Sequence, residues 1–191
     1  MIKRSVLALS ALLALPASAA WQLDTGASEL HFLSTKNAQI TEVHQFDELS
    51  GSVGEDGKLT VAVPLSSVNT AIEIRNTRMQ EKLFETAEFS DAMFTASLPD
   101  DVMSMQAGES QIRTIEGAID LHGKNVATTF KVMINRLNDN TLTVSTVAPT
   151  VLNAGDFGLA EGVKMLQSIA GLDSITMAVP VTFAVTFDQQ Q

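Results

Sequence analysis

The feature that most constrains the fold is a strict alternation of residue types near the C-terminal end of the chain. Every second residue from Ile175 to Phe187 is apolar, with threonine, alanine or proline between them. A period of two is typical of a long β-strand with one buried face. Shorter stretches repeat the pattern, over 59–65, 115–121, 130–134 and 142–144. We count about eight strands, so the sequence predicts an all-β protein.

The arrangement of these strands follows from their single apolar face. With too little helix to cover a sheet, they must close on themselves or stack. The joining loops are short, and Asn138-Asp139-Asn140 between two alternating stretches is typical of a hairpin turn. We therefore expect an eight-stranded antiparallel β-barrel. Such a barrel is either filled by its side chains or encloses one elongated apolar ligand, and the alternation leaves both open.

Two short stretches follow a helical period instead. Residues 76–85 carry apolar side chains four positions apart, with Asn76 or Thr77 as the expected N-cap. Residues 159–170 also have helical spacing, and Gly171 follows where a C-cap glycine is expected. The sequence predicts one or two short helices between strands.

The first residues have the layout of an export signal. Two basic residues precede an apolar run over 5–15, and Ala17-Ser18-Ala19 supplies small residues for cleavage. The run is too short to span a bilayer, and no later segment is apolar enough to form a transmembrane segment. We expect a signal peptide over 1–19, a mature domain over 20–191 and a periplasmic location.

Composition excludes several classes of function. The 191 residues include 12 basic and 22 acidic side chains, a net charge of −10, which argues against a nucleic-acid partner. No cysteine is present, so disulfides, thiolate metal sites and cysteine nucleophiles are excluded. The three histidines lack ligand spacing, and no nucleophile elbow or phosphate-binding glycine pattern occurs. We expect no enzyme, no catalytic residue, no metal and no cofactor.

Two arginines stand out in this acidic chain. Arg75 and Arg78 lie three residues apart at the start of the first helical stretch. One interpretation is helix solubility through ion pairs such as Arg78–Glu81 and Lys82–Glu85. The other is a positive rim that contacts the polar or anionic head group of a ligand whose tail enters the barrel.

A hollow barrel would be lined by the inward phase of the strands. The helical stretches and the turn before the second of them would add lid or lining residues at the mouth. The predicted ligand-binding residues are Phe32, Val61, Val63, Leu83, Phe84, Ile119, Phe130, Val132, Val144, Phe157, Leu166, Val181 and Phe183.

Four short motifs follow one another in the order of a known family. They are Trp21-x-Leu23-Asp24 with Ser28-x-Leu30-x-Phe32, Asn69-Thr70 with Arg75, Met79 and Leu83-Phe84, Gly117-Ala118-Ile119-Asp120-Leu121-His122-Gly123-Lys124, and Asp156-Phe157-Gly158-Leu159. Together they resemble the YceI-like family of exported lipid-binding proteins, over the whole mature chain. Asn76 is a departure, because the family usually has aspartate after the arginine.

The resemblance implies a fold and a function. The fold is an extended, lipocalin-like barrel that is hollow and binds a polyisoprenoid or a related amphiphile such as a quinone. The function is non-enzymatic binding, transport or storage of that lipid in the periplasm. An alternative is an accessory protein of membrane electron transfer or stress response that presents a bound quinone to a redox partner in the membrane. A homodimer also stays open.

Overall fold

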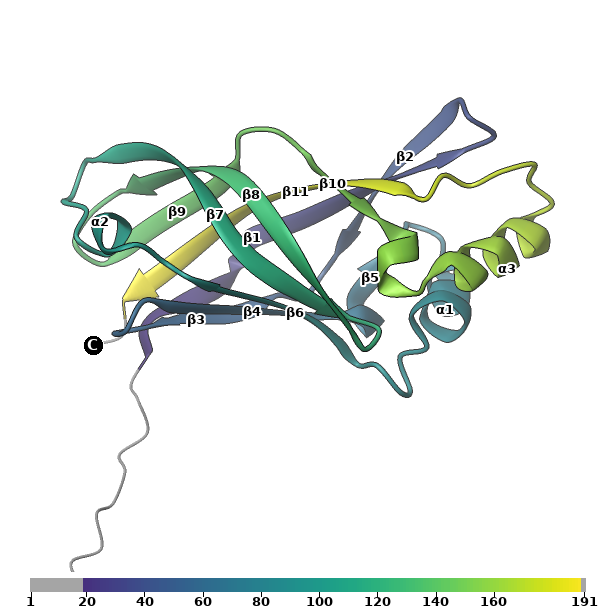
Figure 1. Cartoon of the computed structure of the whole chain (residues 1–191), viewed down its shortest axis with the longest axis horizontal. Helices are drawn as coiled ribbons and strands as arrows, with labels where there is room; N and C mark the ends of the chain where they lie inside the picture. The colour runs from purple at the N-terminus through teal and green to yellow at the C-terminus, as the bar shows by residue number, and fades with distance from the viewer. Residues whose placement is uncertain (1–18, 190–191) are drawn as a thin grey trace, which may run out of the picture.

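The first and last strands of the chain pair side by side, which closes the sheet into a barrel (Figure 1). In the computed structural model, which describes residues 19–189, β1 (Ala19–Lys36) runs antiparallel to β11 (Ala178–Gln189). The pairing extends from Trp21 opposite Gln189 to Phe32 opposite Val181. The expected signal peptide lies almost entirely outside the described residues.

Eight strands form the closed ring, in the order β1-β3-β4-β6-β7-β8-β9-β11 and back to β1. Every pairing in the ring is antiparallel, which confirms the predicted barrel. The remaining ring strands are β3 (Ser50–Gly54), β4 (Lys58–Pro64), β6 (Asp91–Ser97), β7 (Ser110–Leu121), β8 (Lys124–Arg136) and β9 (Thr141–Thr146). The predicted turn at 138–140 joins β8 to β9.

Three further strands lengthen one end of the barrel. The second half of β1 pairs with β2 (Ile40–Phe46), which in turn pairs with the short β5 (Val68–Asn69). The first half of β11 pairs with β10 (Thr150–Asn153). These strands lie at the same end of the molecule as the two longest helices (Figure 1).

The helices differ in detail from the prediction. The first, α1 (Glu73–Met79), begins three residues earlier than expected and continues as one π-helical turn, η2 (Gln80–Phe84). Its N-cap is Ile72, which has no side-chain oxygen, so the predicted caps Asn76 and Thr77 were wrong.

The second expected helix is α3 (Ala160–Ala170), and Gly171 ends it in the left-handed conformation, as predicted. A third short helix, α2 (Asp100–Met103), was not expected from the sequence. It lies at the opposite end of the barrel from α1 and α3 (Figure 1). The 3-10 turns η1 (Leu65–Ser67) and η3 (Ala154–Phe157) complete the elements. None of the helices within residues 19–189 has the length and hydropathy needed to cross a bilayer.

Candidate functional site

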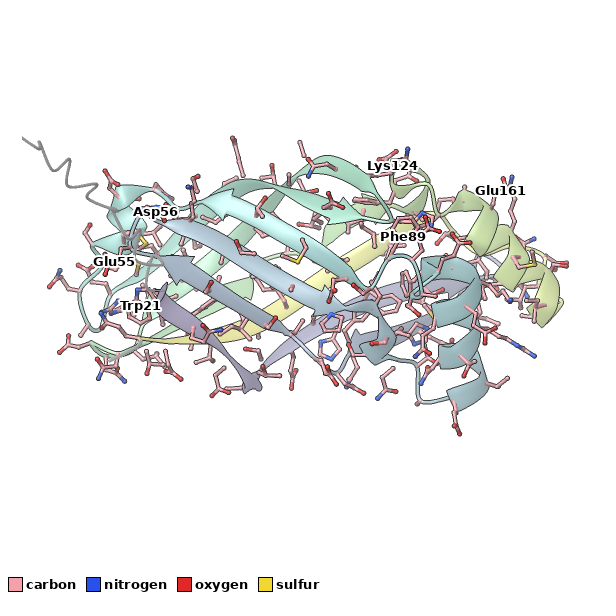
Figure 2. The ribbon with its side chains drawn as sticks, turned by 90° about the horizontal axis from the view of Figure 1, so that it is seen from below. Trp21, Glu55, Asp56, Phe89, Lys124 and Glu161 are labelled. Atoms are coloured by element: carbon pink, nitrogen blue, oxygen red, sulfur yellow. The ribbon has the colours of Figure 1, made fainter. Side chains whose placement is uncertain are left out.

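The barrel is hollow. A cavity of about 640 Å³ lies inside it, and its lining is mostly apolar side chains. The lining includes Trp21 and Phe187 near one end of the strands and residues of α1 and α3 at the other. Figure 2 shows Trp21 near one end of the barrel and Glu161 of α3 at the opposite end. The cavity therefore extends along the length of the barrel, and its volume is typical of ligand pockets.

One end of the cavity is closed by packed side chains. Trp21, Val53 and Phe187 line it and are only 7%, 5% and 4% exposed. The guanidinium carbon of Arg136 lies 4.2 Å from the centre of the Trp21 ring, which places a cation over the aromatic face. This end offers no route for a ligand.

The other end opens between the helices. Ile72 and Ile74 of the α1 region and Ile169 of α3 line the cavity and are 47%, 57% and 40% exposed. Large apolar side chains that contact both the cavity and solvent mark its mouth. The mouth is therefore at the end of the barrel that carries α1 and α3, as predicted from the two helical stretches.

Every residue predicted to contact a ligand lines this cavity, including both arginines of the expected rim. The strand residues point inward because cross-strand partners share one face of the sheet. Phe94, for example, lies opposite both Val61 and Ile119, and Phe32 lies opposite Val181. Their placement makes them candidate contacts, and their role in binding stays a prediction.

Aromatic rings form two groups of contacting side chains in the interior. Phe94 contacts Phe130 edge-on with ring centres 5.2 Å apart, and Phe130 contacts Phe183 in the same way at 5.3 Å. Nearer the mouth, Phe46 lies 5.3 Å from Phe32 and 5.9 Å from Phe84. Such pairs hold their rings in defined positions, so these contacts fix the shape of the cavity wall.

Two helical residues of the lining, Leu83 and Phe84, come from irregular backbone. The Glu85 amide donates to the Gln80 carbonyl, which closes the π-turn η2, and Glu85 itself has a φ of 50°. This turn carries Leu83 and Phe84 into the lining, while Leu166 reaches it from α3. Single π-turns inside helices are frequent at functional sites.

Phe157 lies at the end of η3 and is 2% exposed. The side chain of Asn153 caps this turn by accepting a hydrogen bond from the Gly155 amide. Gly158 then takes a φ of 73°, a conformation that favours glycine. Phe157 is therefore a buried residue of the cavity wall.

The ion pairs of the first helix differ from those expected for solubility. Arg75 reaches back to β2, where its Nη1 donates to Glu42 Oε2 at 2.7 Å, and its Nη2 donates to the Thr70 carbonyl. Lys82 contacts Glu81, and the Glu85 carboxylate accepts a hydrogen bond from His122 Nε2 at 2.8 Å. The predicted pairs Arg78–Glu81 and Lys82–Glu85 were therefore wrong among the described residues.

Three titratable residues of the lining near the mouth were missed by sequence reasoning. Lys36, Glu42 and His44 occupy the inward face of the β1–β2 hairpin near the mouth. Lys36 Nζ lies 2.6 Å from Glu42 Oε2, and His44 Nε2 lies 3.7 Å from the same oxygen. We call Lys36, Glu42, His44 and Arg75 the mouth cluster.

The mouth cluster shifts the ionisation of its members. The hydrogen bond from Lys36, with the charge of Arg75, lowers the pKa of the Glu42 carboxyl. Burial, and then the Arg75 charge, lower the pKa of His44, although Glu42 opposes the shift. At neutral pH Glu42 is therefore ionised and His44 is neutral.

Within residues 19–189 no three His, Asp or Glu side chains gather closely enough to hold a metal ion. His122 lies in the β7–β8 turn with a φ of 53°, and its ring packs against Phe89 at 4.3 Å. Its Nε2 contacts the Glu85 carboxylate, so it joins the β7–β8 turn to the end of η2.

Comparisons with known proteins agree with this geometry. A family model described as the YceI-like domain matches residues 21–187. The structure of a polyisoprenoid binding domain from Saccharophagus degradans implicated in plant cell wall breakdown is similar at a TM-score of 0.87 and 33% identity, covering 91% of this chain and 100% of that one.

More distant structures share the fold. BcnA of Burkholderia cenocepacia gives a TM-score of 0.66 at 17% identity, over 86% of this chain and 98% of its own. The YceI protein of Campylobacter jejuni gives 0.54 at 13% identity, over 99% and 94%. A search of curated proteins finds no significant match.

Proposed function

This chain belongs to the YceI-like domain family, and from that premise we propose that it binds a polyisoprenoid or a related long-chain lipid without catalysing a reaction. The observation that carries the proposal is the apolar cavity of about 640 Å³, closed at the Trp21 end and open between α1 and α3. A cavity with one mouth suits a ligand with an apolar tail and one polar end.

The energy of binding comes from the tail. Each Å² of apolar surface removed from water stabilises the complex by about 25 cal/mol, so a long hydrocarbon chain binds tightly without polar contacts. The lining offers branched aliphatic and aromatic side chains over most of its length, such as Val61, Val132 and Phe130. Methyl-branched isoprenoid chains match such walls in size and chemistry.

The proposed physiological role is transport or storage of this lipid in the periplasm. The export signal expected over residues 1–19 supports that location. A water-filled compartment between two membranes is one in which an isoprenoid needs a protein to shield its chain. Quinones and polyprenyl phosphates share such a chain. Selectivity between them must therefore come from contacts of the head group at the mouth of the cavity.

The test is identification of the natural ligand. The full chain is expressed in its own host, purified from the periplasm without detergent and measured by native mass spectrometry, then extracted with organic solvent. We expect a bound species whose mass matches a polyisoprenoid lipid. Protein that carries no lipid, and that fails to bind isoprenoid alcohols of increasing length when titrated with them, would contradict the proposal.

A further inference from the structure

The inward face of the β1–β2 hairpin changes from apolar to charged toward the mouth. Phe32 of β1 lies opposite His44 of β2, and Ser34 lies opposite Glu42. Lys36 is the next inward residue on β1, because side chains alternate between the two faces of a strand. A ligand whose tail passes Phe32 therefore has its other end beside Lys36, Glu42 and His44.

The mouth cluster carries excess positive charge. Lys36 and Arg75 both contact the same oxygen of Glu42, at 2.6 and 2.7 Å, so one carboxylate compensates two cations. His44 adds no charge at neutral pH. Arg78 also lines the cavity and forms no ion pair with another residue of the described range 19–189. The cluster therefore has one surplus positive charge, and two when Arg78 is included, in a protein whose total charge is −10.

Two buried nitrogen atoms of the cluster have no partner among residues 19–189. They are Nδ1 of His44, whose side chain is only 5% exposed, and Nε of Arg75. The other Arg75 nitrogens already donate to Glu42 and to the Thr70 carbonyl. An arginine Nε–H is a donor only, and a neutral imidazole can take the tautomer that donates. Both atoms therefore suit a ligand that supplies acceptor oxygens.

We propose that the mouth cluster, together with Arg78, is a head-group site for an anionic oxygen acceptor, such as a phosphate attached to the isoprenoid chain. This inference rests on the proposed function, since it concerns the polar end of the same ligand. A phosphate supplies several acceptor oxygens for Arg75 and His44, and its negative charge offsets the surplus of the cluster. A neutral carbonyl or hydroxyl head group would leave that surplus uncompensated.

Glu42 sets the strength of this site. It holds Lys36 and Arg75 in place, and it is also the only acidic side chain in the cluster. Replacing its carboxylate by an amide keeps the size of the side chain and removes the one charge that repels an anion. The structure therefore predicts that a single substitution, Glu42→Gln, tightens binding of a phosphate head group.

The experiment compares two ligands with the same tail. Geranylgeraniol and geranylgeranyl monophosphate compete with a fluorescent isoprenoid analogue for the full mature chain, at low and high salt. We expect the phosphate to bind about tenfold more tightly at low salt, and the advantage to shrink as salt rises. The measured quantity is the dissociation constant of the alcohol divided by that of the phosphate. Glu42→Gln should increase this ratio, whereas Arg78→Gln and His44→Gln should decrease it.

The matched control is Lys131→Gln, which removes a positive charge from an exposed position on the outer face of β8. It should leave the ratio unchanged. If alcohol and phosphate bind equally and no variant moves the ratio, the head-group site is wrong while lipid binding stands. If neither ligand binds, the proposed function itself fails. If Glu42→Gln does not fold, Arg78→Gln alone tests the head-group site. Arg78 makes no ion pair with a residue of the mouth cluster, so its replacement should not disturb the fold.

Discussion

Gly162 of α3 lies against Leu83 of η2 so closely that a Cβ atom at position 162 would be 2.9 Å from the Leu83 Cα. The same atom would be 2.8 Å from the Lys82 carbonyl oxygen. Both neighbours are backbone atoms, which cannot turn aside as a side chain can. The glycine thus permits the contact between the two helical elements that flank the mouth.

Gly162→Ala should therefore destabilise the protein. Helix propensity alone would make alanine better than glycine by about 1 kcal/mol, but overpacking against backbone costs about 1–3 kcal/mol. We expect a lower melting temperature and faster release of bound lipid, because α3 must move away from η2. Ser168→Ala, at an exposed position of the same helix, is the control and should be neutral or stabilising. A more stable Gly162→Ala variant would mean that the helices are not packed as described.

Val181→Trp tests whether the cavity is the binding site. Val181 lies opposite Phe32 and faces the cavity, so an indole has space to enter it. We expect loss of binding of a fluorescent isoprenoid analogue with little change in the melting temperature. Val151→Trp, at a position 61% exposed on β10, should leave binding intact. A loss of stability of about 1–3 kcal/mol at Val181 would instead be the result for a filled core.

Val132→Asp tests the direction of the inward strand face. Val132 is 1% exposed and belongs to the main apolar core, so a carboxylate there would be buried without a partner. We expect a loss of about 3–5 kcal/mol in unfolding free energy, measured by denaturant titration. The neighbouring Lys131→Asp, on the exposed face, should cost little. Equal effects of the two changes would contradict the register of β8.

His44 should make stability depend on pH. Its pKa in the folded protein is lowered below the ordinary value of 6.5 by burial and by Arg75, and Lys36 acts in the same direction against Glu42. Between the folded pKa and 6.5 the unfolded chain binds more protons, so stability falls as the pH drops through that window. Melting temperatures against pH should show this fall in the wild type, and a smaller one in His44→Gln.

His31→Gln serves as the control for that pH series. His31 precedes Phe32 on β1, and its strand phase is opposite to that of the inward residues. This variant removes an imidazole outside the mouth cluster and leaves Lys36, Glu42, His44 and Arg75 in place. A His44→Gln curve that is parallel to the wild-type curve would show that another group is responsible.

The inward and outward faces of the strands could be predicted from sequence, because a period of two allows only two assignments of each strand to the faces of the sheet. Once Phe32, Val132 and Val181 are assigned to one face, every second neighbour follows them. Closure of the barrel followed from the number of strands and the lack of helices. The hollow interior did not follow from the alternation, because filled and hollow barrels of this size use the same pattern.

The mouth cluster was missed because the alternation was followed only through apolar residues. Steps of two from Phe32 lead to Ser34 and Lys36, and steps back from Phe46 lead to His44 and Glu42. The signal was therefore present in the strand phase. The contact of Arg75 with Glu42 was not, because the two residues are 33 positions apart and meet only when α1 packs over the hairpin.

Local rules also failed at the start of α1. Asn76 has the side chain of a good N-cap, but its Oδ1 accepts hydrogen bonds from the amide and hydroxyl of Thr70, from within the helix. Those bonds fix the loop that leads into α1, while Ile72 begins the helix without a side-chain cap. A preference for caps cannot distinguish these two uses of the same residue type.

Closure of the barrel by β1 and β11 has a consequence for how the chain folds. The two strands pair over eight residue positions each, although they come from opposite ends of the sequence. Their pairing joins residues more than a hundred positions apart, and such non-local contacts make folding slow, on a scale of about milliseconds to seconds. Until β11 has been synthesised, β1 has no partner on that side, and the apolar interior remains accessible to solvent. The closed barrel is therefore expected to form only after β11 has been synthesised.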